Sequence, residues 1–447
     1  MESVPEKLLD LAARFDMGVS RPLVWRRKQL QGLYDIIQTE SSVLTDAVLR
    51  DTQCSKVDLL VEMNAVLVCI QQCIDKVSRE AKEGQKTKSG ETHNPVGVVL
   101  ISPDHTSFLA SSMIPMALAF AAGNVVALTS RARPVDDVMK LSLSSYLDQM
   151  GYAILDVPKR SAGSPLDDII ASPSVSVLAT HGGEPISVSG TLQPSTTPSA
   201  VYVNNSAFGL RWKDTPFKTR RQVAQSIARL VVRGVLILGG RVAHTPRLVL
   251  VDDEVSDEFI NALSDVSSEL ARGNGRLSIV EVDLASSAPH VFKDGPAVYV
   301  AKVPSPDAAL DRLQTLSRLS VAYIFSREPF TSYITSNIES DVTLVNDIPT
   351  SFLVNPYSAD MSALESMLAR PQKISCFSAP ASAAPVIPSE SELLSSIKAS
   401  QIERLDEGSG ISTDFFGHVK MVFNAVKYTT YAGIVLTGYM MYNRYQK

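Results

Sequence analysis

The residues with the most reactive side chains are four cysteines and six histidines, and their spacing favours neither disulfide nor metal chemistry. The cysteines at positions 54, 69, 73 and 376 are too few for a disulfide framework and form no Cys-x-x-Cys pair for zinc, so we expect reduced thiols. Cys69 and Cys73 are four residues apart in an apolar helical stretch, which places both on one buried helix face. The histidines are scattered, and we expect no metal site.

Composition and charge narrow the function classes. The chain has 447 residues, of which 45% are hydrophobic and 20% charged, so it is long and apolar enough for two or three globular domains. A net charge of -5 without a basic stripe argues against nucleic acid as a partner. The first residues, MESVPEKLLDLAARFD, lack the basic start and apolar run of a secretory signal, so we expect synthesis to begin in the cytosol.

Periodicity predicts which elements position these side chains. Residues 5 to 86 have helical periodicity apart from a break near Gly18 to Pro22. From Pro95, short runs rich in Val, Ile and Leu alternate with helical stretches, which predicts a parallel sheet covered by helices. A second such set runs from Gly234 to about Asp347, with strands expected at VLIL, RLVLV, AVYVAKV and VAYIFS. It predicts a second α/β domain.

These patterns divide the chain into six predicted segments. They are an N-terminal helical segment (1–90), a Rossmann-like cofactor-type domain (91–233), a catalytic-type α/β domain (234–348), a return segment (349–377), a Ser, Ala and Pro-rich linker (378–412) and a tail (413–447).

The stretch NPVGVVLISPDHTSFLASSMIPMALAFAAGNVVALTSRARP (94–134) resembles the first strand, helix and strand of the aldehyde dehydrogenase cofactor domain. Residues 20 to 51 resemble the opening helices of its class 3 branch, which includes the fatty aldehyde dehydrogenases. SVAYIFSRE (320–328) and Val345 to Asp347 also match. The resemblance implies an α/β, aldehyde dehydrogenase-like fold: a Rossmann-type parallel sheet domain and a second α/β domain, with N-terminal helices and a C-terminal membrane helix.

The motifs that define activity in that family are altered at each position in this sequence. Where the family has Trp-Asn, whose Asn donates to the oxyanion, the chain has Asp104 and His105. The Lys-Pro-Ser-Glu that holds the adenosine ribose corresponds to residues 129 to 132, although Arg131 or Arg133 could instead face a 2'-phosphate. An exposed, solvated arginine is the commoner situation at such a strand end.

The nicotinamide-side turn of the family, Thr-Gly-Ser, corresponds to Thr180, Gly182 and Gly183. These are the candidate cofactor-binding residues, for NAD or NADP, although paired glycines occur in many strand-to-helix turns. The segment expected to supply the general base, residues 191 to 199, contains no carboxylate, and Glu184 upstream is more plausibly a surface residue.

The nucleophilic cysteine of the family corresponds to Val242, or to Ala243 if the gap is placed differently. Thiohemiacetal formation needs a thiolate, and none of the four cysteines falls in this window. The Glu-Ile-Phe-Gly-Pro motif corresponds to residues 292 to 296, with Phe292 in place of Glu. We therefore assign no catalytic residue and note His105 and Val242 as the altered positions.

The tail contains an uncharged run from Tyr428 to Asn443 between basic residues, with tyrosines toward both ends. At ~1.5 Å per residue the run falls short of a ~30 Å hydrocarbon core, so it spans only if flanking residues snorkel. Interfacial tyrosines favour a membrane anchor or an interfacial helix, with the body on the cytosolic face, over a soluble docking helix. The resemblance to fatty aldehyde dehydrogenases favours the same interpretation.

Two functions remain open at this point. In the first, the chain is a membrane-anchored pseudoenzyme that acts as a scaffold, as a homodimer or as a heterodimer with an active paralogue, because class 3 members are typically dimers. In the second, it oxidises long-chain aldehydes with NAD or NADP through residues such as His105 or His244. Retention of an aldehyde or lipid without turnover is a third possibility.

Overall fold

The computed structural model divides the chain into two compact units, Met1–Ile402 and Glu403–Lys447. It describes residues 3–402 except 53, 84–94, 105–106, 158–168, 170–171, 173, 181–190, 193–198, 210–218, 241, 243, 275–276, 283–295, 317–318, 355–376 and 379–389. The predicted tail, residues 413–447, lies outside the described residues.

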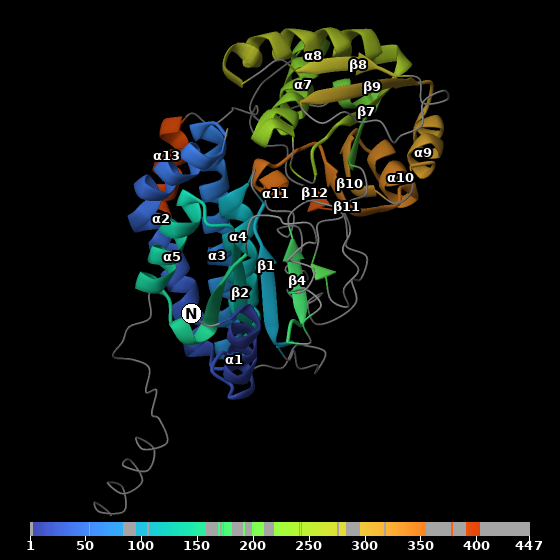
Figure 1. Cartoon of the computed structure of the whole chain (residues 1–447). Coiled ribbons are helices and arrows are strands. Elements are labelled where there is room, and N and C mark those ends of the chain that lie inside the picture. Colours follow the sequence, from blue (N-terminus) through green and yellow to red (C-terminus); the bar gives the residue numbers. More distant parts are fainter. Residues whose placement is uncertain are drawn as a thin grey trace, which may run out of the picture. The chain divides into compact units, whose positions relative to one another are not determined.

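Three helices open the chain, as the periodicity predicts (Figure 1): α1 (Val4–Asp16), α2 (Leu23–Asp51) and α3 (Lys56–Glu83). Their buried faces contribute to the main hydrophobic core, and Cys69 and Cys73 are buried there as expected. Two helical stretches, residues 56–81 and 220–240, are long and apolar enough to resemble membrane spans. However, 72% and 78% of their most apolar segments are buried within the protein. Both are therefore core helices.

A five-stranded parallel sheet follows, in the order β3-β2-β1-β4-β5. Its strands are β1 (Val98–Ser102), β2 (Val125–Ser130), β3 (Tyr152–Asp156), β4 (Val177–Thr180) and β5 (Thr191–Leu192), with helices α4 (Phe108–Ala122) and α5 (Pro134–Tyr146) and the short helix η1 (Gln149–Gly151) between the first three. This is a Rossmann-type arrangement, in which the chain reverses direction across the sheet between β1 and β4.

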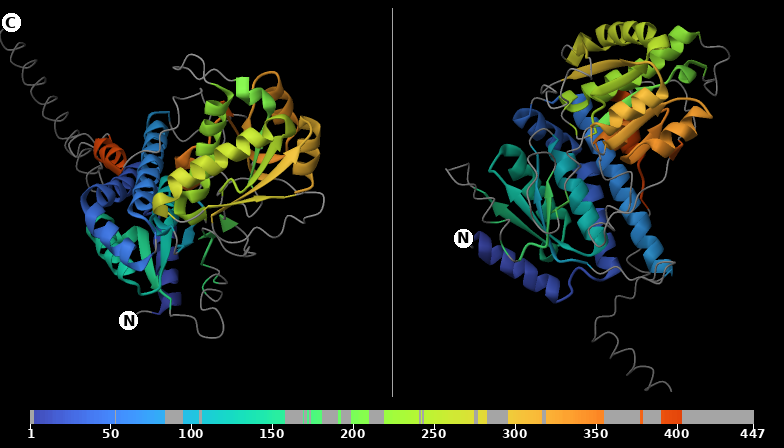
Figure 2. Two further views of the ribbon diagram at one scale, coloured as in Figure 1. Left: turned by 90° about the horizontal axis from the view of Figure 1, so that it is seen from above. Right: turned by 90° about the vertical axis from the view of Figure 1, so that its right-hand side faces the viewer.

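A second parallel sheet has seven strands in the order β12-β11-β10-β6-β7-β9-β8. They are β6 (Ser199–Val203), β7 (Leu248–Asp252), β8 (Ser278–Glu281), β9 (Ala297–Val303), β10 (Leu319–Phe325), β11 (Ser340–Val345) and β12 (Phe377–Ser378). The helices between them are η2 (Asn205–Gly209), α7 (Arg220–Leu236), η3 (Ile237–Gly240), α8 (Asp253–Asn274), α9 (Pro306–Gln314), α10 (Phe330–Asn337) and α11 (Thr350–Val354). Figure 2 shows α7 and α8 on one side of this sheet and α9 and α10 on the other.

The second sheet begins earlier than the predicted boundary at 233/234. Strand β6 lies between β10 and β7 and is paired with both, so residues 199–203 belong to the second sheet. The predicted strand VLIL was also wrong. Its residues form the end of α7 and η3, because the preceding apolar residues repeat with the helical period and the chain then turns through three left-handed residues.

The predicted linker, 378–412, contains a helix, α13 (Glu390–Ala399). Leu393 and Ile397 of this helix are buried in the main core, at helical spacing. The composition of the segment is that of a linker. Its two apolar side chains at helical spacing, Leu393 and Ile397, nevertheless allow α13 to pack against α3.

Candidate functional site

Two carboxyl groups in the first turns of α3 are bonded to the backbone of η3 and of α4. Asp58 of α3 accepts a hydrogen bond from the backbone N–H of Leu238 in η3, at 3.3 Å. Glu62, one turn further along α3, accepts hydrogen bonds from the amides of Leu109 and Ala110 at the start of α4. We call this region the α3 junction. It joins the helices that flank both sheets.

Val242 lies just beyond η3, at the position where the resemblance expects a nucleophilic cysteine. Its side chain is 5% exposed and belongs to the main hydrophobic core. Its carbonyl oxygen accepts hydrogen bonds from the N–H and the hydroxyl of Thr245, at 3.2 and 2.7 Å. The alternative position, Ala243, lies outside the described residues.

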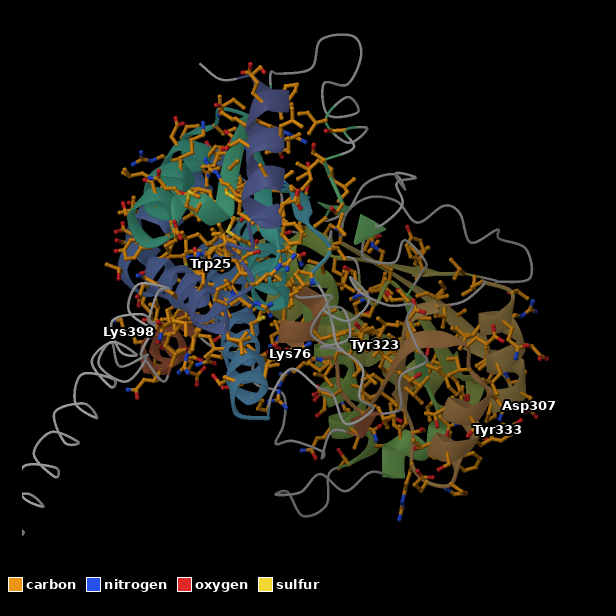
Figure 3. The ribbon with its side chains drawn as sticks, turned by 90° about the horizontal axis from the view of Figure 1, so that it is seen from below. Trp25, Lys76, Asp307, Tyr323, Tyr333 and Lys398 are labelled. Atoms are coloured by element: carbon orange, nitrogen blue, oxygen red, sulfur yellow. The ribbon has the colours of Figure 1, made fainter. Side chains whose placement is uncertain are left out.

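The backbone around Val242 is held on both sides. Leu238, Gly239 and Gly240 have φ values of +51°, +65° and +72°, a left-handed run that redirects the chain after α7. On the other side, the Ser199 hydroxyl donates to the Thr245 carbonyl at 2.5 Å, and the Tyr323 hydroxyl donates to the His244 carbonyl at 2.9 Å. Tyr323 is labelled in Figure 3, where it lies within the second lobe.

His244 is the one histidine near this loop that the described part of the chain contains. Its side chain is 5% exposed, and its ring is stacked on Phe352 of α11 with 4.9 Å between centroids and 9° between planes. The imidazole is therefore a packing group in this arrangement. His105, the other histidine named in the sequence analysis, lies outside the described residues.

Glu62 was not anticipated from the sequence. It is 1% exposed, and its carboxyl group accepts from Leu109 N at 3.1 Å and Ala110 N at 3.2 Å. The pKa of Glu62 is raised to about 8: burial is the largest cause, the nearby carboxylates of Asp58 and Asp104 contribute, and the two amide hydrogen bonds oppose the shift. A single acidic residue inside the apolar run LLVEMNAVLV (59–68) was the available signal.

Cys54, just before α3, also lies at the α3 junction. The thiol is half-buried and 2.9 Å from the Thr52 hydroxyl. Burial raises the pKa of Cys54, and the carboxylates of Glu62 and Asp58 raise it further. The thiol form therefore prevails at neutral pH, which makes this sulfur a weak nucleophile. Among the described residues, no group of three or more His, Cys, Asp or Glu side chains could hold a metal ion.

The carboxyl end of β2, where the resemblance expects a ribose clamp, is occupied by a carboxylate of the chain itself. Asp136 accepts from the amides of Arg131 and Arg133 at 2.9 and 3.0 Å, and it forms an ion pair with the Arg133 guanidinium at 3.2 Å. Asp51 accepts from the amide of Val135 at 2.9 Å, so the amino end of α5 is bonded to two acidic side chains. Arg131 itself is exposed.

Thr180 ends β4, and its backbone is in register with Ser102 at the end of β1. It therefore lies at the switch point of the first sheet, the usual location of a dinucleotide site in such sheets. Gly182, Gly183 and Glu184 lie outside the described residues, as do 292–295.

Comparison with known sequences finds partial similarity. No family model matches the chain. Aldehyde dehydrogenase family 3 member F1 of Arabidopsis thaliana is 26% identical over 167 residues, which cover 35% of this chain and 34% of that protein. Family 3 member B1 of Homo sapiens is 26% identical over 168 residues (35% and 36%), and member A2 of Mus musculus is 28% identical over 163 residues (34% and 33%). The chain thus spans about a third of the length of these relatives.

Solved structures match much more of the chain. The substrate-bound AldH of Staphylococcus aureus has a TM-score of 0.59 at 16% identity, covering 80% of this chain and 87% of that one. Betaine aldehyde dehydrogenase of the same organism, in complex with NAD+, has a TM-score of 0.61 at 13% identity, covering 77% and 79%. The chain therefore has the aldehyde dehydrogenase fold, with parallel sheets in two α/β lobes, and its sequence resembles family 3 of that superfamily.

Proposed function

We propose that this chain is a catalytically inactive aldehyde dehydrogenase relative, which acts at a membrane as a scaffold or as the partner of an active paralogue. The observation that carries the proposal is the burial of Val242 in the hydrophobic core, at the position of the nucleophile. Oxidation by the family's route needs a thiolate to bond the aldehyde carbon while hydride leaves, and a valine side chain forms no such bond.

The other groups at the α3 junction do not replace this function. The Cys54 thiol has a raised pKa, and the Glu62 carboxyl group is buried and bonded to the amino end of α4. His244 is stacked in the interior. These features support an inactive site.

The described residues at the end of β2 do not fit the 2'-phosphate of NADP. The amides of residues 131 and 133 and the Arg133 guanidinium are bonded to Asp136, so a 2'-phosphate would have to displace a buried carboxylate. Asp51 adds a second negative charge beside it. Weak or absent NADP binding is therefore part of the proposal, and the missing Lys-Pro-Ser-Glu clamp at residues 129 to 132 extends this expectation to NAD.

The test is a single-turnover assay of the purified full-length protein with NAD or NADP and a long-chain aliphatic aldehyde. We expect no reduced nicotinamide and no thermal shift with either nucleotide. A nucleotide that bound only the folded state, at a concentration of 100 times its Kd, would raise the free energy of unfolding by ~2.7 kcal/mol. An active family 3 enzyme serves as positive control. Cofactor-dependent formation of reduced nicotinamide that is lost in H244N or H105N would refute the proposal and favour long-chain aldehyde oxidation.

Attachment to the cytosolic face of a membrane through the C-terminal tail is the second part of the proposal. It rests on the uncharged, tyrosine-flanked run from Tyr428 to Asn443. Deletion of residues 420–447 should move the protein from the membrane to the soluble fraction, and a full-length protein that is already soluble would disprove it. Co-purification with itself or with an active paralogue tests the proposed homodimer or heterodimer.

A further inference from the structure

Helix α13 is a short element held against α2 and α3, directly before the point where the first compact unit ends at Ile402. Leu393 and Ile397 are buried beneath it. Figure 1 shows α13 beside the opening helices, and the turned view in Figure 2 agrees. Lys398, labelled in Figure 3, marks its carboxyl end.

The carboxyl end of α13 is bonded by neutral side chains of α2 and α3. The last carbonyls of a helix have no partner within the helix, so they need donors from elsewhere. Those donors come from two neighbouring helices: Gln38 Nε2 to Ile397 O at 2.7 Å, Tyr34 OH to Ser400 O, and Gln71 Nε2 to Gln401 O at 3.2 Å. Gln71 Nε2 also donates to the Ser400 hydroxyl at 2.9 Å.

Two further contacts fix the direction of α13 along α3. The Ser396 hydroxyl donates to Asn64 Oδ1 at 3.1 Å, and Lys56 pairs with Glu390 at 2.5 Å. Lys56 and Glu390 are both exposed, so this pair adds little. The attachment of α13 thus depends on the buried side chains of Leu393 and Ile397 and on the hydrogen bonds at the carboxyl end of the helix.

Such an attachment is easily weakened. A helix of ten residues is marginal by itself in water, so α13 is helical because it is docked. The partial negative charge of its carboxyl end meets neutral donors from α2 and α3, and Lys398 is the basic side chain in its last turn. A negative charge added at Ser400 would be repelled by these carbonyls.

Ser400 lies in a sequence where a protein kinase could add such a charge as a phosphate group. It is half-buried directly after α13, and Glu403 follows three residues later in the sequence, with Asp406 and Glu407 beyond. Carboxylates after a serine are recognised by acidic-directed protein kinases, whose basic subsites pair with them. Ser55 has the same spacing to Asp58, but its hydroxyl is bonded to that carboxylate at the start of α3.

We propose that Ser400 is a phosphorylation site and that its phosphorylation releases α13 from α2 and α3. The Ser400 Oγ attacks the γ-phosphorus of ATP bound to the kinase, the bond to the ADP oxygen breaks, and the hydroxyl proton passes to the kinase base. The products are phosphoserine and ADP. The added charge of about -1.5 to -2 opposes the helix dipole, and the Gln71 contact must rearrange.

The test uses full-length protein, an acidic-directed serine kinase and Mg-ATP, with phosphosites mapped by mass spectrometry. We expect phosphate on Ser400, none on Ser55, and none at that position in S400A. In the phosphorylated protein, amide hydrogen exchange over residues 390–399 should accelerate by about tenfold, while α4 is unchanged. Phosphate that never reaches Ser400, or phosphorylated Ser400 with unchanged exchange, overturns the proposal.

The pair S400D and S400N separates charge from shape. Both replace the hydroxyl by groups of similar size, and only Asp adds a charge, so exchange over α13 should be faster in S400D than in S400N. Equal exchange in the two variants, with equal melting temperatures, would also overturn the proposal. The measurement needs no dehydrogenase activity and no membrane, so it can fail while the proposed function stands.

Discussion

Single side chains at and near the α3 junction have structural roles, and one of them, Val242, is at a position where the resemblance expects chemistry. Glu62 bonds the amino end of α4, Asp58 bonds η3, and Val242 fills core space. The altered position at Val242 could be found from the sequence, because a resemblance assigns it a role. Glu62 could not, because one acidic residue in an apolar run gives no sign of which amides it will meet.

The pKa of Glu62 leads to a pH prediction. Its value in the folded chain is about 8, above its ordinary value of 4.5, so between these pH values the folded state binds the proton and the unfolded state does not. The free energy of unfolding contributed by this group is therefore fully present below pH 4.5 and is lost as pH rises toward 8, by up to about 4 kcal/mol between pH 5 and pH 8.

The substitution E62Q should remove that part of the pH dependence, because the amide oxygen still accepts from Leu109 and Ala110 but does not titrate. Urea unfolding at several pH values measures it. E281Q, at an exposed position on β8, is the control, and its free energy of unfolding should depend on pH as that of the natural protein does. If E62Q and the natural protein lose stability in parallel from pH 5 to pH 8, the titration of Glu62 is not responsible.

Among the elements, α4 explains best how the first lobe is held together. All but its last residue are buried, so both ends must be satisfied inside the protein. Glu62 accepts hydrogen bonds at the amino end, and the buried, positively charged Arg26 of α2 donates to Ala121 O at 3.4 Å at the carboxyl end, where its charge is opposite in sign to the helix dipole. The helices of the first lobe were predictable from periodicity, whereas these end contacts depend on residues distant in sequence.

Elements were mispredicted where local pattern and long-range pairing disagree. VLIL has strand-like composition but continues the helical period of α7, and SAVYV joins the second sheet because its partners are β7 and β10 rather than β4. Nothing within a strand of five residues identifies its neighbours. The helix α13 was hidden by the Ser and Pro content around it.

The turn after α4 supplies a prediction at this scale. Gly123 has φ +87°, and a Cβ there would lie 2.5 Å from the Arg26 guanidinium, which cannot move without losing its bonds to Ser20 O and Ala121 O. G123A should therefore destabilise the fold by about 2 to 4 kcal/mol, from the backbone conformation plus the displaced cap.

The matched control is G18A. Gly18 has a similar φ of +80°, but the nearest atom to its Cβ would be 3.5 Å away, so only the backbone term of about 1 kcal/mol applies. Chemical denaturation of both variants gives the difference. Equal losses in G123A and G18A would mean that the contact with Arg26 has no energetic consequence.

At the scale of the whole unit, one fold carries two parallel sheets whose connection runs through α3. Its first turns bond both η3 and α4, and α13 and α11 pack against it. The loop where the resemblance expects the nucleophile is bonded to Ser199 and Tyr323, and Val242 in this loop is buried in the core.

The substitution V242C tests this closed arrangement directly. If Val242 faces the packed core, the introduced thiol should react with a water-soluble maleimide at least about 100-fold more slowly in the native protein than in urea, because labelling requires local opening. The natural protein, with its half-buried Cys54, gives the background. V242C should also gain no aldehyde oxidation with NAD or NADP, since a buried thiol stays protonated and out of reach. Rapid labelling of the native variant, accompanied by cofactor-dependent activity, would mean that the loop borders an open site and that loss of a single cysteine had silenced it.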